Sequence, residues 1–146
     1  MIACVYGVIW ILAQLVSVAQ EDRTGDITIT LTGIRNTSGA ISVNLFNSAT
    51  GFPSDHTRAI KRIRSEIAGN SCIVTFKDIP FGVYAVSVYH DENNDHVFNE
   101  TWYGMPKEGV GISNNAPITF REPKFEEAIF NHNTSLHPIV ISLKYF

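Results

Sequence analysis

Acidic and amide side chains alternate along one short segment near the middle of the chain, between Asp91 and Glu100. Asp91, Asn93 and Asp95 have the spacing of positions one, three and five of a calcium-binding loop, and Asn99 falls at position nine. Because calcium prefers carboxylate and amide oxygens, this spacing predicts a calcium site. The candidate metal ligands are Asp91, Asn93, Asp95, Asn99 and Glu100.

The second half of the segment departs from the calcium-loop pattern. Position six is His96 where glycine is usual, and position twelve is Trp102 where a bidentate glutamate is usual. Glu100, or a glutamate from a later segment, would have to supply that ligand, and the affinity would be low, as in extracellular modules. The alternative interpretation is that these acids and amides cap turns by accepting hydrogen bonds from nearby backbone amides.

The segment that positions this loop is the strand predicted just before it, from Gly82 to His90. Apolar residues occupy both sets of alternate positions there, which is typical of a central strand covered on both faces. Neighbouring strand residues point to opposite faces. His90 and Asp91 therefore do not converge on one substrate if the strand includes both.

The rest of the chain is dominated by short strands separated by turns. Alternating apolar residues predict strands at 26–34, 40–46, 62–67, 72–76 and 137–145. We expect the first two to pair as an antiparallel hairpin, and the next two to form a hairpin around Gly69 and Asn70. The segment 58–69 also fits a helical period, but the strand is favoured, preceded by one helical turn near 54–60.

Residues 101–138 are irregular, with glycines and prolines between aromatic residues. We expect a long loop that covers one sheet face, with a short helical or extended piece near 125–130. Six or seven short strands without a long amphipathic helix predict an all-β fold. The expected architecture is an antiparallel β-sandwich of about seven strands, transthyretin-like or immunoglobulin-like, in a single domain at 26–146.

Four residues of the irregular segment form a second candidate site: Trp102, Tyr103, Asn114 and Asn115. Flat aromatic rings and amides suit the faces of carbohydrates and peptides, so this set predicts a carbohydrate or protein partner at the loop end. The competing interpretation is that the aromatic residues cover a second hydrophobic core.

An uncharged apolar run occupies residues 1–19 and ends at a polar flank. Ser17 and Ala19 are small residues at the positions that a signal peptidase requires, so the run predicts a signal peptide and an exported protein, periplasmic or secreted. An uncleaved membrane anchor is the alternative, since the run is just long enough to span a bilayer. After cleavage no membrane span would remain, Cys4 would be lost, and Cys72 would be a lone, buried thiol.

Charge and motif content argue against several functions. A net charge of -3 over 146 residues gives no basic field for nucleic acid. Nucleophile-elbow, phosphate-loop, dinucleotide and HExxH motifs are all missing, so no catalytic residue is assigned. We therefore expect an exported binding or surface module that is not an enzyme. A hydrolase that uses His90, Asp91 or Glu108 and a purely structural envelope component are the alternatives.

An ordered set of short motifs gives the chain a family resemblance. The motifs are GFP at 51–53, GVYAVSVYHDENND at 82–95, YGMPKEGVGISNNA at 103–116 and EPKFEEAIF at 122–130. In this order they resemble the bacterial exported proteins grouped as domain of unknown function family 2141. The resemblance implies an exported β-sandwich similar to transthyretin-like and carboxypeptidase-regulatory modules, and no known activity. The family's acidic loop has glycines where this chain has Asn94 and His96.

Overall fold

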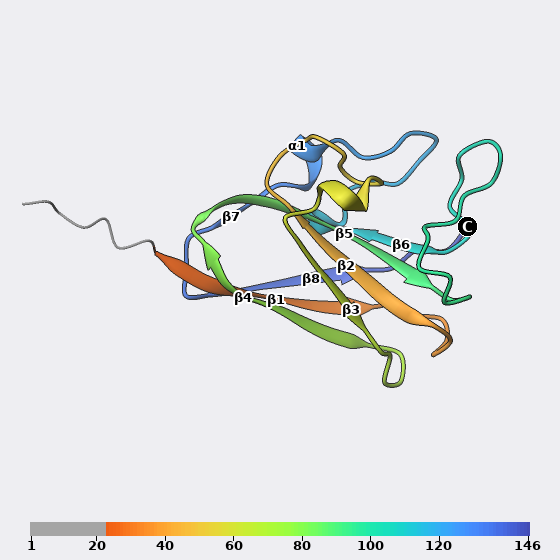
Figure 1. The fold of residues 1–146 in the computed structure, drawn as a ribbon, viewed down its shortest axis with the longest axis horizontal. Helices are drawn as coiled ribbons and strands as arrows, with labels where there is room; N and C mark the ends of the chain where they lie inside the picture. Colours follow the sequence, from red (N-terminus) through yellow and green to blue (C-terminus); the bar gives the residue numbers. More distant parts are fainter. Residues whose placement is uncertain (1–22) are drawn as a thin grey trace, which may run out of the picture.

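Two β-sheets packed face to face form the body of the protein (Figure 1). The computed structural model describes residues 23–146, and the predicted signal peptide at 1–19 lies outside the described residues. The strands are β1 (Thr24–Thr32), β2 (Ala40–Phe46), β3 (Lys61–Ser65), β4 (Cys72–Pro80), β5 (Gly82–Asp91), β6 (Gly109–Ile112), β7 (Phe130–His132) and β8 (Leu136–Ser142). The predicted all-β sandwich is confirmed, and no helix within 23–146 is long and apolar enough to cross a membrane.

The strand β5 lies at the centre of the larger sheet, whose order is β3-β2-β5-β6, with β7 paired to the start of β5. The smaller sheet has the order β4-β1-β8, in which β1 and β8 run parallel. Every β5 side chain from Tyr84 to Asp91 is buried, which confirms the predicted central strand. The last residue of this strand, Asp91, lies at the loop end of the sandwich.

The first predicted hairpin is wrong, and the second is confirmed only at its turn. β1 and β2 belong to different sheets, and so do β3 and β4, although a bridge between Ala68 and Ser71 closes the expected tight turn at Gly69 and Asn70. Alternation shows that one face of a strand is buried, but a strand buries the same residues whether its neighbour lies beside it or in the facing sheet. The two connections instead carry the chain from one sheet to the other.

The segment 101–138 has more regular structure than the sequence predicted. It contains β6, β7, the start of β8, a 3-10 turn η2 (Ser113–Asn115) and the helix α1 (Phe125–Ala128). Strands of three or four residues are too short for a visible alternation. The helical piece expected near 125–130 is confirmed as α1, and the turn expected near 54–60 is the 3-10 turn η1 (His56–Arg58).

Two hydrophobic clusters bury the two faces of the larger sheet. The main core lies between the sheets and includes Ile29, Val43, Phe76 and Val86. A smaller cluster on the outer face joins Ala85, Ile112, Ala116 and Ala128, with Phe52, Ile118, Phe125 and Ile129 packed against it. The segment after β6 therefore covers the outer face, and Cys72 is buried in the main core as expected.

Candidate functional site

The loop after β5 is wrapped around the carboxylate of Asp91, which is fully buried. Its Oδ1 accepts a hydrogen bond from the backbone N–H of Asp95 at 3.2 Å, and its Oδ2 accepts one from that of His96 at 2.9 Å. The guanidinium of Arg64 lies 2.7 Å from Oδ2. These contacts are the turn capping that the sequence suggested, and they fix the start of the loop.

Three further residues of the predicted metal set bind one another in the same loop. The Asn93 side-chain amide donates to Asp95 Oδ2 at 3.0 Å and to Asn99 Oδ1 at 3.1 Å, while Asn99 donates to Asp95 Oδ2 at 3.1 Å. Asp95 Oδ1 accepts the N–H of Val97 at 2.9 Å, and this bond, with those from the two asparagines, lowers the pKa of Asp95. Four of the five predicted ligands therefore lie in one cluster.

Glu108, just before β6, completes this acidic cluster. Carboxylate oxygens of Asp91, Asp95 and Glu108 all lie within 4.8 Å of one another. The Glu108 residue is only 5% exposed, and its Oε2 accepts the N–H of Asn99 at 3.3 Å. Among the described residues, its Oε1 is one of two buried side-chain atoms without a hydrogen-bond partner. Such a group costs stability until a donor or a cation reaches it.

The electrostatics of the cluster also favour a bound cation. Burial raises the pKa of Glu108 to about 7, and the negative charges of Asp91, Asp95 and Glu92 contribute to the rise. Asp91 and Glu108 are buried, whereas Asp95 is exposed. Like charges held this close repel one another, and a cation between them would relieve that repulsion. The arrangement can therefore hold a metal ion through hard oxygen ligands.

Glu100, the fifth predicted ligand, lies elsewhere. It lines a neighbouring cavity, and its backbone forms a bridge with Pro106. The chain turns back after it, and the Lys107 N–H bonds to the Asn99 carbonyl at 2.9 Å, which brings Glu108 to the cluster. Glu108 is too far along the chain for the twelve-residue calcium pattern. The one signal that could have found it is an acid directly preceding the short strand GVGI.

Asn94 and His96, the two positions where the resemblance implies glycines, both adopt positive φ angles, of 58° and 64°. Glycine enters this left-handed region freely, asparagine tolerates it, and histidine enters it at some cost. The loop therefore makes a left-handed turn at both positions. That turn directs the N–H groups of Asp95 and His96 at the Asp91 carboxylate.

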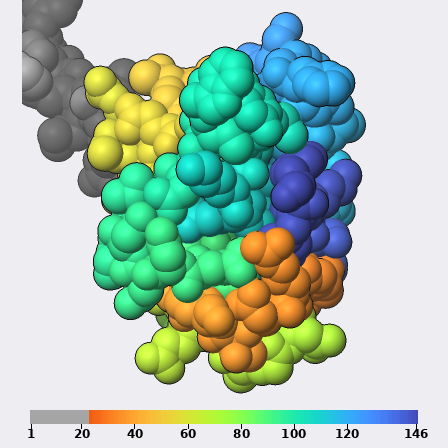
Figure 2. All heavy atoms as spheres, turned by 90° about the vertical axis from the view of Figure 1, so that its right-hand side faces the viewer, coloured from red at the N-terminus to blue at the C-terminus, as the bar shows by residue number. Residues whose placement is uncertain are grey.

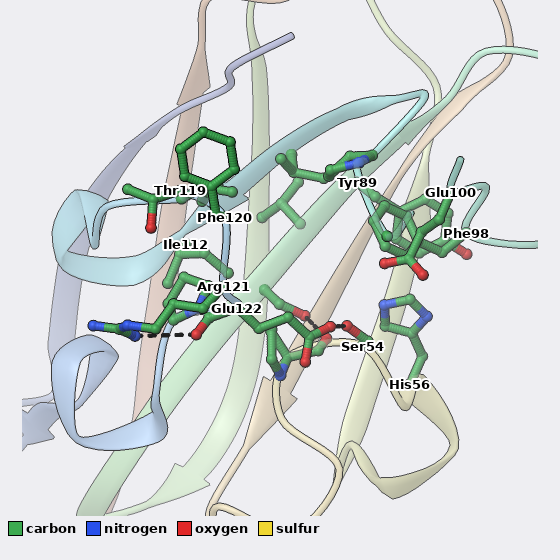
Figure 3. Close-up of a pocket in the computed structure, with 18 of the residues that line it drawn as sticks. Ser54, His56, Tyr89, Phe98, Glu100, Ile112, Thr119, Phe120, Arg121 and Glu122 are labelled. Carbon is green, nitrogen blue, oxygen red and sulfur yellow. Dashed lines mark hydrogen bonds between the residues drawn. The ribbon is translucent and has the colours of Figure 1, made fainter. Parts of the chain in front are cut away.

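A cavity of about 250 Å³ lies beside the acidic cluster, with the loop as one wall (Figure 3). Its floor includes Tyr89 and Ile112, and the loop contributes Phe98, Glu100 and Tyr103. The opposite wall comes from the stretch of chain before α1, around Glu122.

The structure brings only part of the predicted ligand-binding set together: the rings of Trp102 and Tyr103 pack edge to face with 5.2 Å between centroids, whereas Asn114 and Asn115 have other partners. Tyr103 lines the cavity, whereas Trp102 is 95% exposed. The Asn114 side chain donates to the Ile129 carbonyl at 2.7 Å, and the Asn115 side chain accepts the Ser142 N–H at 2.9 Å. The two asparagines thus tie η2 to neighbouring backbone.

The structure separates His90 from the other two residues of the hydrolase alternative, Asp91 and Glu108, which both belong to the acidic cluster. His90 is fully buried, and its ring nitrogens contact the Tyr145 hydroxyl at 2.8 Å and the Ser38 carbonyl at 2.7 Å. Asp91 points to the other face of β5, as expected for the next residue of a strand. Neither His90 nor Glu108 lines the cavity.

Residues 29–138 match the family model described as "Uncharacterized protein conserved in bacteria (DUF2141)". This match spans more than half of the chain and includes both the acidic cluster and the cavity. No curated protein and no solved structure matches the chain.

Proposed function

We propose that this chain, which belongs to the DUF2141 family of uncharacterized proteins conserved in bacteria, is a binding module without enzymatic activity. Its acidic cluster takes up a calcium ion, and the ion orders the loop end of the sandwich. The observation that carries this proposal is the buried, unpartnered Glu108 Oε1 close to the carboxylates of Asp91 and Asp95.

The chemistry of the cluster favours calcium over other metals. All three carboxylates are hard oxygen ligands, and the amides of Asn93 and Asn99 add oxygens when their side chains rotate. Transition metals favour imidazole or thiolate ligands, and among the described residues no His or Cys belongs to the group formed by these three carboxylates. An irregular loop also suits the flexible coordination of calcium better than the strict octahedron of magnesium.

The contacts of Asp91 set an upper limit on the affinity. Its Oδ2 already accepts the His96 N–H and pairs with Arg64, while Oδ1 accepts one N–H and keeps a lone pair for an ion. The charge of Arg64 opposes a cation at this distance. We therefore expect binding in the millimolar range that is typical of extracellular modules, which agrees with the predicted signal peptide and a periplasmic or secreted location.

The calcium site and the neighbouring cavity share one loop. The loop between Asp95 and Glu108 carries Phe98, Glu100 and Tyr103, which form one wall of the cavity. An ion held at both ends of the loop would fix that wall. Calcium would then prepare a binding surface without taking part in any reaction.

Thermal unfolding of the full chain in chelator and in calcium tests the proposal. With a dissociation constant of about 1 mM, about 10 mM calcium should stabilise the folded state by about 1.4 kcal/mol, a shift of a few degrees in the melting temperature. Glu108→Gln keeps the size of the side chain and should abolish most of this shift. Glu126→Gln, at an exposed glutamate of α1, is the matched control and should respond as the wild type does.

Two results would overturn the calcium site. One is an unchanged melting temperature in wild-type protein at about 10 mM calcium, measured against magnesium at equal ionic strength. The other is an equal shift in wild type and Glu108→Gln, which would place any bound ion elsewhere.

A further inference from the structure

The cavity beside the loop has a wall of aromatic rings. The His56 ring is stacked on Tyr89 with 4.7 Å between ring centroids, and Phe98 packs against both, at 5.9 Å from His56 and 5.6 Å from Tyr89. These rings come from η1, from β5 and from the acidic loop. In Figure 2 the yellow segment around η1, the teal segment that follows the acidic loop and the blue segment before α1 lie next to one another on one face of the molecule, with the teal segment in the middle.

The charges around this cavity are unbalanced toward the negative. Glu100 and Glu122 both line it, and neither forms a salt bridge within the described part of the chain. Burial raises the pKa of Glu122, and the negative charge of Glu100 raises it further, so the two carboxylates repel each other. Ser54 donates a hydrogen bond to Glu122 and holds it at the wall (Figure 3).

The basic residues of the cavity wall do not offset these charges. Arg121 is ion-paired with Glu127 at 2.7 Å, and its side chain extends away from Glu100 in Figure 3. Burial, assisted by the charge of Arg62, lowers the pKa of His56 to about 4, so its ring is neutral near pH 7. Within residues 23–146, no other Lys, Arg or His lines the cavity.

We propose that this cavity binds an organic cation, an alkylammonium group, between the aromatic wall and the carboxylates of Glu100 and Glu122. A cation over the face of an aromatic ring is attracted by the ring's quadrupole, and unpaired carboxylates supply the opposite charge. The cavity volume of about 250 Å³ accommodates a four-carbon amine or a single lysine side chain. The inference uses none of the three carboxylates of the acidic cluster, because Glu100, a calcium ligand predicted from the sequence, lines this cavity instead.

Titration of the full chain with n-butylammonium chloride, followed by backbone amide chemical shifts, tests this site. Shifts should concentrate at Tyr89, Phe98 and Glu122 and saturate in the millimolar range. The neutral isostere n-butanol should bind about tenfold more weakly, because it lacks the charge. The double variant Glu100→Gln/Glu122→Gln should lose about tenfold in ammonium affinity, whereas Glu126→Gln should bind as the wild type does.

A second pair of probes identifies the source of the ammonium group. A blocked Gly-Lys-Gly peptide that binds more tightly than n-butylammonium would indicate a lysine side chain of a protein partner, and the reverse order would indicate a free small amine. Equal affinity for n-butanol and n-butylammonium, unchanged affinity in the double variant, or shifts outside the cavity would each overturn the proposal.

The same titration separates this inference from the calcium proposal. Carried out in chelator, it should still detect the ammonium site, and calcium should tighten it because both ligands favour the ordered loop. Ammonium binding in a protein without a calcium response would reject the calcium site alone. If calcium stabilises the protein but ammonium binds neither in chelator nor in calcium, the cavity proposal alone would be rejected.

Discussion

Two buried polar regions begin at adjacent residues of β5 and differ in how completely their hydrogen bonds are satisfied. On the inner face, both ring nitrogens of His90 have partners. On the outer face, Asp91 is bonded by two backbone N–H groups and Arg64, but the nearby Glu108 keeps an unpartnered oxygen. A satisfied buried network holds a fold together, whereas an unsatisfied group lowers stability unless a ligand reaches it. This contrast supports the proposal that the Glu108 region binds a cation, whereas the His90 region only stabilises the fold.

Removal of Asp91 is the strongest test of the comparison. Asp91→Ala should lower the free energy of unfolding by about 3 kcal/mol in chelator, because the N–H groups of Asp95 and His96 and the charge of Arg64 lose their partner. Chemical denaturation measures the change. The exposed Asn93→Ala is the control and should cost less than about 1 kcal/mol. An Asp91→Ala protein as stable as the wild type would show that this carboxylate does not organise the loop.

The pH dependence of the metal-free protein tests Glu108 next. The folded pKa is about 7 and the ordinary value is 4.5, so the folded state retains a proton that the unfolded chain releases. This contribution to stability is complete below about pH 4.5 and is lost as the pH rises through about 7. Glu108→Gln removes the loss, and at about pH 8 in chelator it should be more stable than the wild type by about 2 kcal/mol.

Denaturation midpoints of both proteins at several pH values between about 5 and 8 measure this effect. The stability difference should grow with pH. A constant difference, or a wild type that gains relative stability at high pH, would mean that Glu108 is already satisfied in the absence of an ion.

The smallest effect is expected in the His90 region. Tyr145→Phe removes the hydroxyl that contacts His90 Nδ1 and should cost about 1 kcal/mol. Because the Tyr145 hydroxyl contacts His90 and the Arg35 N–H and none of the carboxylates of the acidic cluster, the stabilisation by calcium should be the same in Tyr145→Phe and in the wild type. Melting temperatures with and without calcium measure both quantities. A changed calcium response would show that the two regions are coupled across β5.

The strands were predictable from the sequence, whereas the sheet pairing was not. The alternation in β1 and the doubly apolar pattern of β5 identify strands because burial of a strand face leaves a period of two. The assignment of β1 and β2 to different sheets depends on the direction in which the connection leaves the strand. Local sequence carries little of that information, so neither expected pair of strands lies side by side in one sheet, although the turn at Gly69 and Asn70 was predicted correctly.

The candidate metal site was predictable only where its residues are local. Asp91, Asn93, Asp95 and Asn99 belong to one turn, so their spacing revealed the cluster. Glu108 enters through a reversal of the chain and the pairing of Gly109 with His90 in the neighbouring strand. Its place depends on tertiary structure, which is why Glu100 was chosen from the spacing instead.

A crystal structure of the protein in about 10 mM calcium chloride is the most direct test of the central claim, that a calcium ion satisfies Glu108. We expect an ion about 2.3–2.6 Å from Glu108 Oε1 and from oxygens of Asp91 and Asp95, which is the usual range for calcium. A well-ordered loop with no ion among the three carboxylates, and with Glu108 Oε1 bonded to water or to Arg64, would contradict the account.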